Sequence, residues 1–133
     1  MIHQTAHWQT RGSEYYGDHL MFMRLYEQSQ DFIDQMAERT VGAGSPALVG
    51  ARQQIDAMKR VIDDMFPSKS HAPPASDLVR ISLAAEMAFV EELASVYQEL
   101  ERAGKMSRGT SNLLEGVADK HEEFIYLLRQ RAT

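Results

Sequence analysis

Two pairs of metal-binding side chains lie within the first forty residues. His7 and His19 are twelve residues apart, and Asp34 and Glu38 are four residues apart. Imidazole nitrogens bind iron, zinc and copper, and carboxylates are oxygen ligands for harder cations. On one straight helix, twelve residues would separate the two histidines by about 18 Å. With a turn between two antiparallel helices, they could instead face each other near the corner.

The two carboxylates are one helical turn apart, so both point to the same side of a helix, and Asp31 adds a third to that stripe. Each pair also has a purely structural interpretation. His7 could cap a helix end while His19 lies on the surface. The acidic stripe could be a solvated helix face, with Arg39 or an arginine of another helix as its partner. Spacing alone leaves both interpretations open.

Two further residues are best interpreted as parts of the fold and not of a functional site. His121 lies between Val117 and Phe124 on an apolar stripe, which predicts a hydrogen-bonded core histidine. Trp8 follows His7 and is expected to be a packing anchor.

The sequence contains no phosphate-binding loop, no Rossmann glycine pattern and no HExxH motif. No glutamate precedes a histidine by three residues, so the di-iron motif of helical bundles is missing.

The acidic charge is concentrated in one segment. The net charge is −5, and residues 13–39 hold six carboxylates against two arginines. The four lysines are scattered, and there is no cluster of Lys and Arg. Because binding to the DNA backbone needs several cations close together, no nucleic-acid partner is expected. A divalent cation is the more natural partner of the acidic segment.

Length and composition predict one soluble domain over residues 1–133, because a chain of this size buries a single core. There is no cysteine, which is compatible with a reducing cytosol. No apolar run approaches the roughly 20 residues that span a bilayer, and the first residues do not form a signal peptide. We therefore expect a cytoplasmic protein with no membrane partner.

Helical spacing of apolar residues recurs along the chain, and strand patterns are nearly missing. Gly12 and Ser13 are expected to cap the ends of the first two helices, and Ser45 and Pro46 to start the third. Gly50 weakens the first turns of the third helix. We expect helices over 1–10, 14–40, 46–66, 76–103 and 110–131, with a linker over 67–75. The third should have one apolar face, formed by Leu48, Ile55, Met58, Ile62 and Met65. This pattern predicts an all-α bundle.

Thirteen positions in the first half of the chain resemble one known family in identity and register. The residues are His7-Trp8, Arg11-Gly12, His19, Tyr26, Asp34, Ala37-Glu38-Arg39 and Gly44-Ser45-Pro46. They resemble the Dps family, the miniferritins of the ferritin-like superfamily, whose order is HWxxRG, a second histidine, DxxAER and a G-S-P turn. The likeness continues into the last helix, with Leu113-Leu114, Asp119-Lys120-His121 and Leu127-Leu128. It implies a ferritin-like helical bundle with a truncated first helix and a short helix between the second and third bundle helices.

The resemblance also implies a use for the separated half-sites. In Dps proteins a two-fold dimer brings the histidines of one chain opposite the carboxylates of the other. The family oxidises Fe(II), preferably with hydrogen peroxide rather than oxygen, and stores ferric mineral inside a shell of twelve subunits. By this resemblance His7 and His19 would be iron ligands from one chain, and Asp34 and Glu38 from its neighbour. Asp18, Asp31 and Trp8 are accessory candidates.

The sequence departs from the family at one ligand. Four residues after the second histidine the family usually has an aspartate, and here that position is Met23. A thioether is a soft, neutral and poor ligand for iron. Asp18 is adjacent to His19 but points about 100° away around the helix, which makes it a weak substitute. The site could bind iron loosely, bind another ion or be inactive. The alternative function is therefore a non-catalytic ferritin-like oligomer that has lost ferroxidase activity.

The second departure is length. The family's first helix begins some twenty residues before its His-Trp pair, and here six residues precede His7. Either the reading frame is incomplete or the chain is a natural short variant. A shortened helix would leave apolar surface uncovered, which a partner chain could cover. The basic N-terminal tail that many relatives use for DNA is also missing.

Overall fold

All regular elements are helices in the part of the chain that the computed structural model describes, residues 1–66 and 71–133. The elements in chain order are α1 (Ile2–Gln9), α2 (Tyr15–Gly42), the 3-10 helix η1 (Pro46–Val49), α3 (Ala51–Met65), α4 (Ala75–Arg102) and α5 (Arg108–Ala132). The expected all-α fold is confirmed. Residues 67–70 of the expected linker lie outside the described residues. Among the described helices, none is long and apolar enough to cross a membrane.

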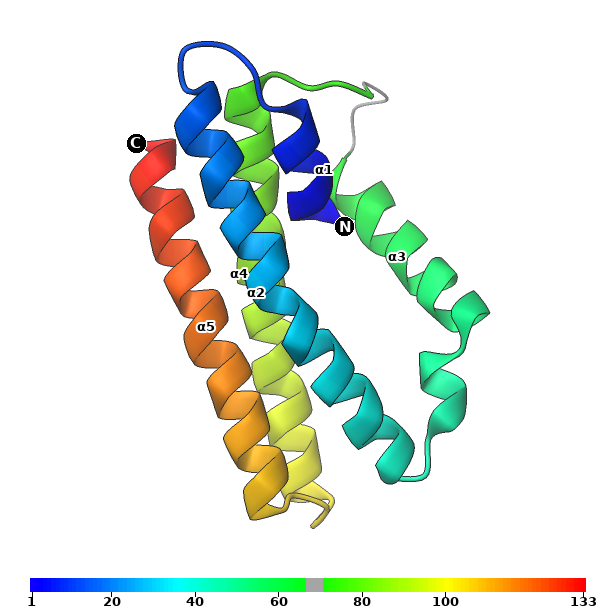
Figure 1. Ribbon diagram of the computed structural model, residues 1–133. Helices are drawn as coiled ribbons and strands as arrows, with labels where there is room; N and C mark the ends of the chain where they lie inside the picture. The colour runs from blue at the N-terminus through cyan, green and yellow to red at the C-terminus, as the bar shows by residue number, and fades with distance from the viewer. Residues whose placement is uncertain (67–70) are drawn as a thin grey trace.

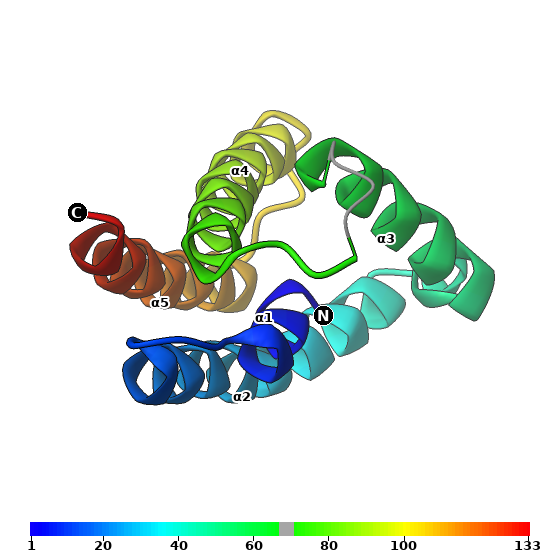
Figure 2. The same cartoon turned by 90° about the horizontal axis from the view of Figure 1, so that it is seen from above.

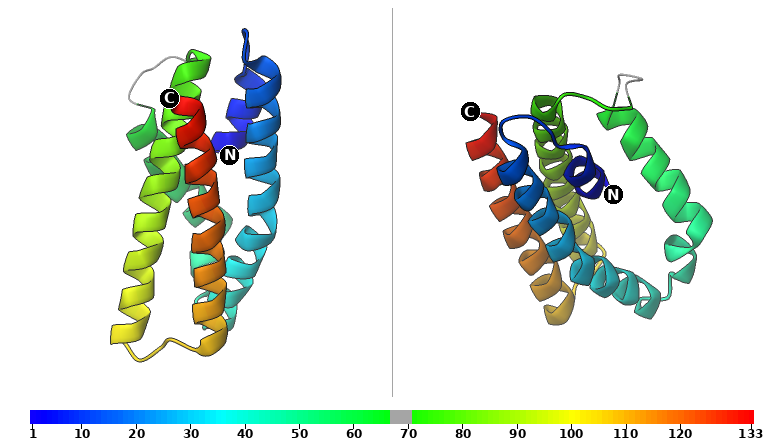
Figure 3. Two further views of the ribbon diagram at one scale, coloured as in Figure 1. Left: turned by 90° about the vertical axis from the view of Figure 1, so that its left-hand side faces the viewer. Right: turned by 45° about the horizontal axis from the view of Figure 1, so that its top comes forward.

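Three long helices, α2, α4 and α5, run side by side and form the body of the bundle (Figure 1). Helices α4 and α5 are joined by a tight turn and pack along their length (Figure 3). The short α1 lies against α2 and α4 at one end of the bundle (Figure 2). The helices α1, α2, α4 and α5 agree with the expected ferritin-like bundle, in which α1 is short and the helices η1 and α3 fall between α2 and α4.

The core follows the helical spacing of the apolar residues. Buried side chains recur at three- and four-residue steps along α5, namely Leu113, Leu114, Val117, His121, Phe124, Ile125 and Leu128. They pack into two clusters. One cluster, beside α1, contains Ala6, Phe22, Leu25, Leu78, Val79, Phe124 and Leu128. The other, nearer the turn between α4 and α5, contains Leu93, Leu113, Leu114 and Val117.

The apolar face expected for the third helix is mostly solvent-exposed. No residue of α3 is buried, and Ile55 is 64% exposed. Helix α3 stands apart from the three long helices at the edge of the molecule (Figure 2). The prediction of an amphipathic helix was therefore right about the pattern. The sequence pattern did not show that most of the apolar face of α3 is solvent-exposed in a single chain.

The predicted caps at the first corner were wrong. Thr10 ends α1 by donating its amide to the carbonyl of Ala6, and Glu14 precedes α2 without a side-chain cap. Gly12 instead lies between the helices with φ of +93°, a conformation that only glycine adopts without strain. Its role is to reverse the direction of the chain so that α2 can return along α1.

The third and last helices begin elsewhere than expected. Gly50 has an extended backbone, with ψ of 144°, and divides the expected helix over 46–66 into η1 and α3. The last helix begins at Arg108, two residues before the expected start. The cause is Ser107, whose hydroxyl accepts a hydrogen bond from the amide of Thr110 and so caps the helix.

A buried ion pair joins the beginning of α2 to the end of α5. Asp18 is 1% exposed, and its two oxygens accept hydrogen bonds from Arg131 Nε at 2.6 Å and Nη2 at 3.1 Å. A two-point pair of this kind is geometrically specific and stronger than a neutral hydrogen bond. It ties together residues 113 positions apart in the sequence.

We predict that Arg131→Ala lowers the free energy of unfolding by about 3 kcal/mol, because it leaves the Asp18 carboxylate buried without a partner. Urea denaturation followed by circular dichroism measures this loss. Arg129→Ala is the matched control, since Arg129 lies on the same turn and its guanidinium donates to the Met87 sulfur. Equal losses in the two variants would contradict a specific role for the pair.

Candidate metal centre

The two histidines face each other at the corner between α1 and α2. His7 Nδ1 lies 2.8 Å from the carbonyl oxygen of His19, and His19 Nδ1 lies 3.0 Å from the carbonyl oxygen of His7. Their rings are stacked, with centroids 3.8 Å apart and planes 26° apart. The expectation that a turn would bring them together is confirmed.

This reciprocal pairing determines the tautomer of both rings. A carbonyl oxygen can only accept a hydrogen bond, so each Nδ1 must carry the proton that it donates. In the neutral ring, the lone pair then lies on Nε2, the atom that would bind a metal. A hydrogen bond from the second nitrogen to a backbone carbonyl is how metal-binding histidines are usually oriented. The pair is therefore suited to bind a cation through two Nε2 atoms.

Aromatic residues surround the histidine pair. Tyr15 stacks on His19 with ring centroids 5.0 Å apart, and the edge of Tyr26 meets His7 at 5.4 Å. Trp8, in contrast, is 68% exposed. The prediction that Trp8 is a packing anchor was wrong within one chain, because the side of α1 that carries it faces away from the bundle core.

The carboxylates of the second half-site are solvent-exposed. Asp31, Asp34 and Glu38 all lie on the outer surface of α2. Over residues 1–66 and 71–133, none of the three forms an ion pair with Lys, Arg or His. Arg39, their expected partner, packs instead over Gly109 at the start of α5. Glu38 also lines a hollow of about 520 Å³ between these two helix ends.

The two half-sites do not meet within one chain. Helix α2 is continuous from Tyr15 to Gly42 and carries both His19 and Asp34. Fifteen residues of α-helix rise by about 22 Å, far beyond the reach of ligands to one ion. Within the described part of the chain, no group of three or more His, Asp or Glu side chains could hold a metal ion.

The accessory candidates fare differently. Both oxygens of Asp18 are engaged by Arg131, so its carboxylate serves the fold and is not free to act as a ligand. Met23, which takes the place of the family's aspartate, is half-buried on α2.

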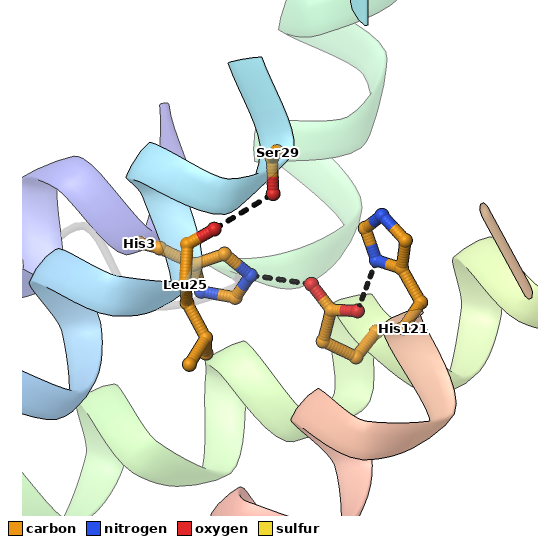
Figure 4. A network of polar contacts seen from close by, with 5 residues as sticks. His3, Leu25, Ser29 and His121 are labelled. Carbon is orange, nitrogen blue, oxygen red and sulfur yellow. Dashed lines mark hydrogen bonds and ion pairs between the residues drawn. The ribbon is translucent and has the colours of Figure 1, made fainter. Parts of the chain in front are cut away.

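Sequence reasoning missed a second polar cluster in the interior. The Glu86 carboxylate of α4 lies between two imidazoles, 2.5 Å from His3 Nε2 on α1 and 2.5 Å from His121 Nδ1 on α5. Figure 4 shows both rings directed at the same carboxylate. The predicted burial of His121 with a hydrogen-bond partner is thus confirmed. A signal for Glu86 was present, since it lies seven residues from both Val79 and Leu93 on the buried stripe of α4.

The histidines determine the ionisation of this carboxylate. Burial by itself would raise the pKa of Glu86, because a low-dielectric interior disfavours charge. Hydrogen bonds from His121 and His3 outweigh burial, so the pKa of Glu86 lies below its ordinary value of 4.5. The aromatic rings of Phe89 and Phe124 pack against His121, with centroids 4.4 Å and 5.1 Å away. The cluster is thus a charged group inside an apolar environment.

Comparison with known proteins finds a relative that aligns with most of this chain. No family model matches the chain. The nutrient stress-induced DNA-binding protein of Nostoc sp. (strain PCC 7120) is 28% identical over 128 residues, which cover 95% of this chain. The matched region spans 65% of that relative's length. A stress-induced DNA-binding protein agrees with the resemblance of the histidine and carboxylate motifs to the Dps family.

We predict that Glu86→Gln lowers the free energy of unfolding by about 2 kcal/mol near neutral pH, since a charged acceptor is lost. Because folding lowers the pKa of Glu86, its contribution is full above 4.5, the ordinary pKa, and is lost as pH falls through the lower folded value. The gap between wild type and variant should therefore narrow below pH 4.5. Urea denaturation across pH measures it, with exposed Glu91→Gln on the same helix as control. A gap that widens on acidification would refute this assignment.

Proposed function

Because the chain resembles the Dps family and is similar to a nutrient stress-induced DNA-binding protein, we propose that it handles iron by binding and oxidising Fe(II) at sites shared between two copies of the chain. The observation that carries this proposal is the hydrogen-bonded pair of His7 and His19, which offers two Nε2 lone pairs. Over residues 1–66 and 71–133, no third ligand lies beside them. Iron is here the substrate, and peroxide the preferred oxidant.

A two-fold dimer would complete the ligand set. The carboxylates of Asp34 and Glu38 are too far along α2 to reach the histidines of their own chain, so they serve a partner's histidines. In an isologous contact the same pairing occurs twice, which makes two equivalent sites per dimer. The surface near the histidines supports such a contact, because Trp8, Tyr16 and Leu20 are large apolar side chains left exposed there.

Two imidazoles and two carboxylates form a set suited to Fe(II) that leaves positions open for an oxidant. Two Fe(II) ions give one electron each to one peroxide molecule, which with two protons becomes two molecules of water. Met23 supplies no negative charge where the family has an aspartate. The site therefore binds iron weakly, and the missing charge disfavours Fe(III) more than Fe(II).

Met23 is also the observation that favours the second candidate, a non-catalytic ferritin-like oligomer. In that case the bundle and its assembly persist without oxidation. Storage of ferric mineral in a twelve-subunit shell belongs to the first candidate and rests on the family resemblance. DNA binding is part of the name of the Nostoc relative, whereas the acidic charge of this chain predicts no duplex binding at physiological salt.

We predict that Met23→Asp tightens Fe(II) binding and speeds peroxide-dependent oxidation, because it restores an anionic ligand. His19→Ala and Asp34→Ala should slow oxidation by about 10-fold or more, since each removes one ligand of the same site. The measurement is ferric absorbance after anaerobic addition of Fe(II) and then peroxide. Glu27→Ala is the matched control, as it removes an exposed carboxylate of the same helix that lies outside the proposed ligand set.

The assay separates the two candidates. If wild type matches a protein-free blank and Met23→Asp gains nothing, the ferroxidase proposal fails and the oligomer proposal stands.

A shared site also predicts complementation between two inactive variants. One variant lacks the histidine half-site, with His7→Ala and His19→Ala, and the other lacks the carboxylate half-site, with Asp34→Ala and Glu38→Ala. Neither should oxidise iron alone. After unfolding and refolding together, mixed dimers contain one intact site, so activity should return in the mixture. No recovery, or a monomer by light scattering at micromolar concentration, would rule out sharing.

A further inference from the structure

We propose that Glu86 is a positioning residue for the histidine half-site, acting through His3 and α1. The expected effect on Fe(II) oxidation rests on the proposed function. The placement of His7 by Glu86 rests on the contacts of the fold alone. Nothing in the sequence motifs connects Glu86 with the candidate site. The connection comes from the contacts of α1.

Helix α1 has little apolar attachment to the bundle. It has eight residues, and helices this short are not stable by themselves in water. Its buried residues are Ala6 and His7, of which only Ala6 belongs to the apolar core. Polar contacts must therefore determine where α1 lies. This matters because α1 presents His7.

Polar contacts hold α1 at both ends. At its start, His3 Nε2 donates to Glu86 Oε1, and both side chains are nearly buried. At its end, the Gln9 side chain donates to the carbonyl of His71 at 2.7 Å, and Arg11 donates to the carbonyls of Ala72 and Pro73. The contacts at the end are exposed or half-buried, whereas the contact at the start joins two nearly buried side chains, so breaking it leaves the Glu86 carboxylate short of one partner in the interior.

His3 and His7 are one helical turn apart, so they lie on the same face of α1. A rotation or shift of α1 that breaks the contact of His3 with Glu86 must also carry the His7 ring away from His19. Glu86 is itself held by His121 of α5 through its other oxygen, at 2.5 Å. The chain of contacts thus runs from α5 through α4 to α1, and ends at the candidate ligand.

The test uses a matched pair of substitutions at His3. His3→Gln keeps an amide donor at the position of Nε2, whereas His3→Leu removes the donor and keeps similar bulk. Long-range proton–nitrogen NMR of the metal-free protein reports the ring tautomers directly. We expect His7 in wild type and His3→Gln to show one tautomer, with the proton on Nδ1. In His3→Leu and Glu86→Gln, the His7 signals should move toward averaged values.

Oxidation of Fe(II) by peroxide provides the second readout. His3→Leu and Glu86→Gln should lower the initial rate by about 10- to 100-fold, the effect typical of residues that orient metal ligands. His3→Gln should stay within about threefold of wild type. Leu93→Ala controls for lost stability, because it opens the other core cluster, away from α1, and should leave the His7 tautomer unchanged.

The outcomes are distinguishable. A His7 tautomer that is unchanged in His3→Leu overturns the positioning role, as does an equal change in Leu93→Ala. If wild type oxidises no iron, the proposed function fails while the NMR comparison still decides the positioning role. If the tautomer is lost in His3→Leu and oxidation is unaffected, positioning by Glu86 is not needed for catalysis and the proposal is refuted.

Discussion

The arrangement of the bundle depends on one buried carboxylate. Glu86 is 4% exposed and lies between the two apolar clusters, with one imidazole at each oxygen. A charge in the interior is tolerated only when it is hydrogen-bonded, so the helices that supply its partners cannot shift by a turn without a large penalty. Apolar side chains are more permissive, because a shifted helix can often repack them. The cluster therefore specifies the register of α1, α4 and α5.

A second interior charge has the same effect at another place. Asp18 and Arg131 hold the beginning of α2 to the end of α5, close to the corner that carries the histidines. The Glu86 cluster holds α1, and the pair of Asp18 with Arg131 holds α2, so both helices that meet at the histidine corner are fixed to the bundle. The reciprocal hydrogen bonds of His7 and His19 then have a rigid frame. Such support by outer residues is what keeps ligand geometry close to what a metal requires.

The same rigidity keeps the two half-sites apart. A continuous α2 cannot bend to bring Asp34 toward His19, so the histidine pair and the carboxylate pair of one chain stay at a constant separation. The uncovered apolar side chains of α3 and the exposed Trp8 give the single chain surface that is unfavourable in water. In the proposed function, contact with another chain covers apolar surface and brings the histidine pair of one chain to the carboxylate pair of the other.

Much of this protein could be predicted from sequence because the relevant signals are local. The apolar spacing of α2, α4 and α5, the breaks at glycine and proline, and the meeting of His7 with His19 across a short turn all depend on near neighbours. Tertiary structure decided the rest. Glu86 pairs with a histidine 83 residues away and Asp18 with an arginine 113 residues away. The exposure of Trp8 likewise depends on which face of α1 the bundle covers. Periodicity shows which positions are inside a helix bundle, but it does not show which buried charge meets which donor. That choice is made only when separate helices pack, because the cost of an unpaired interior charge arises only once water has been excluded.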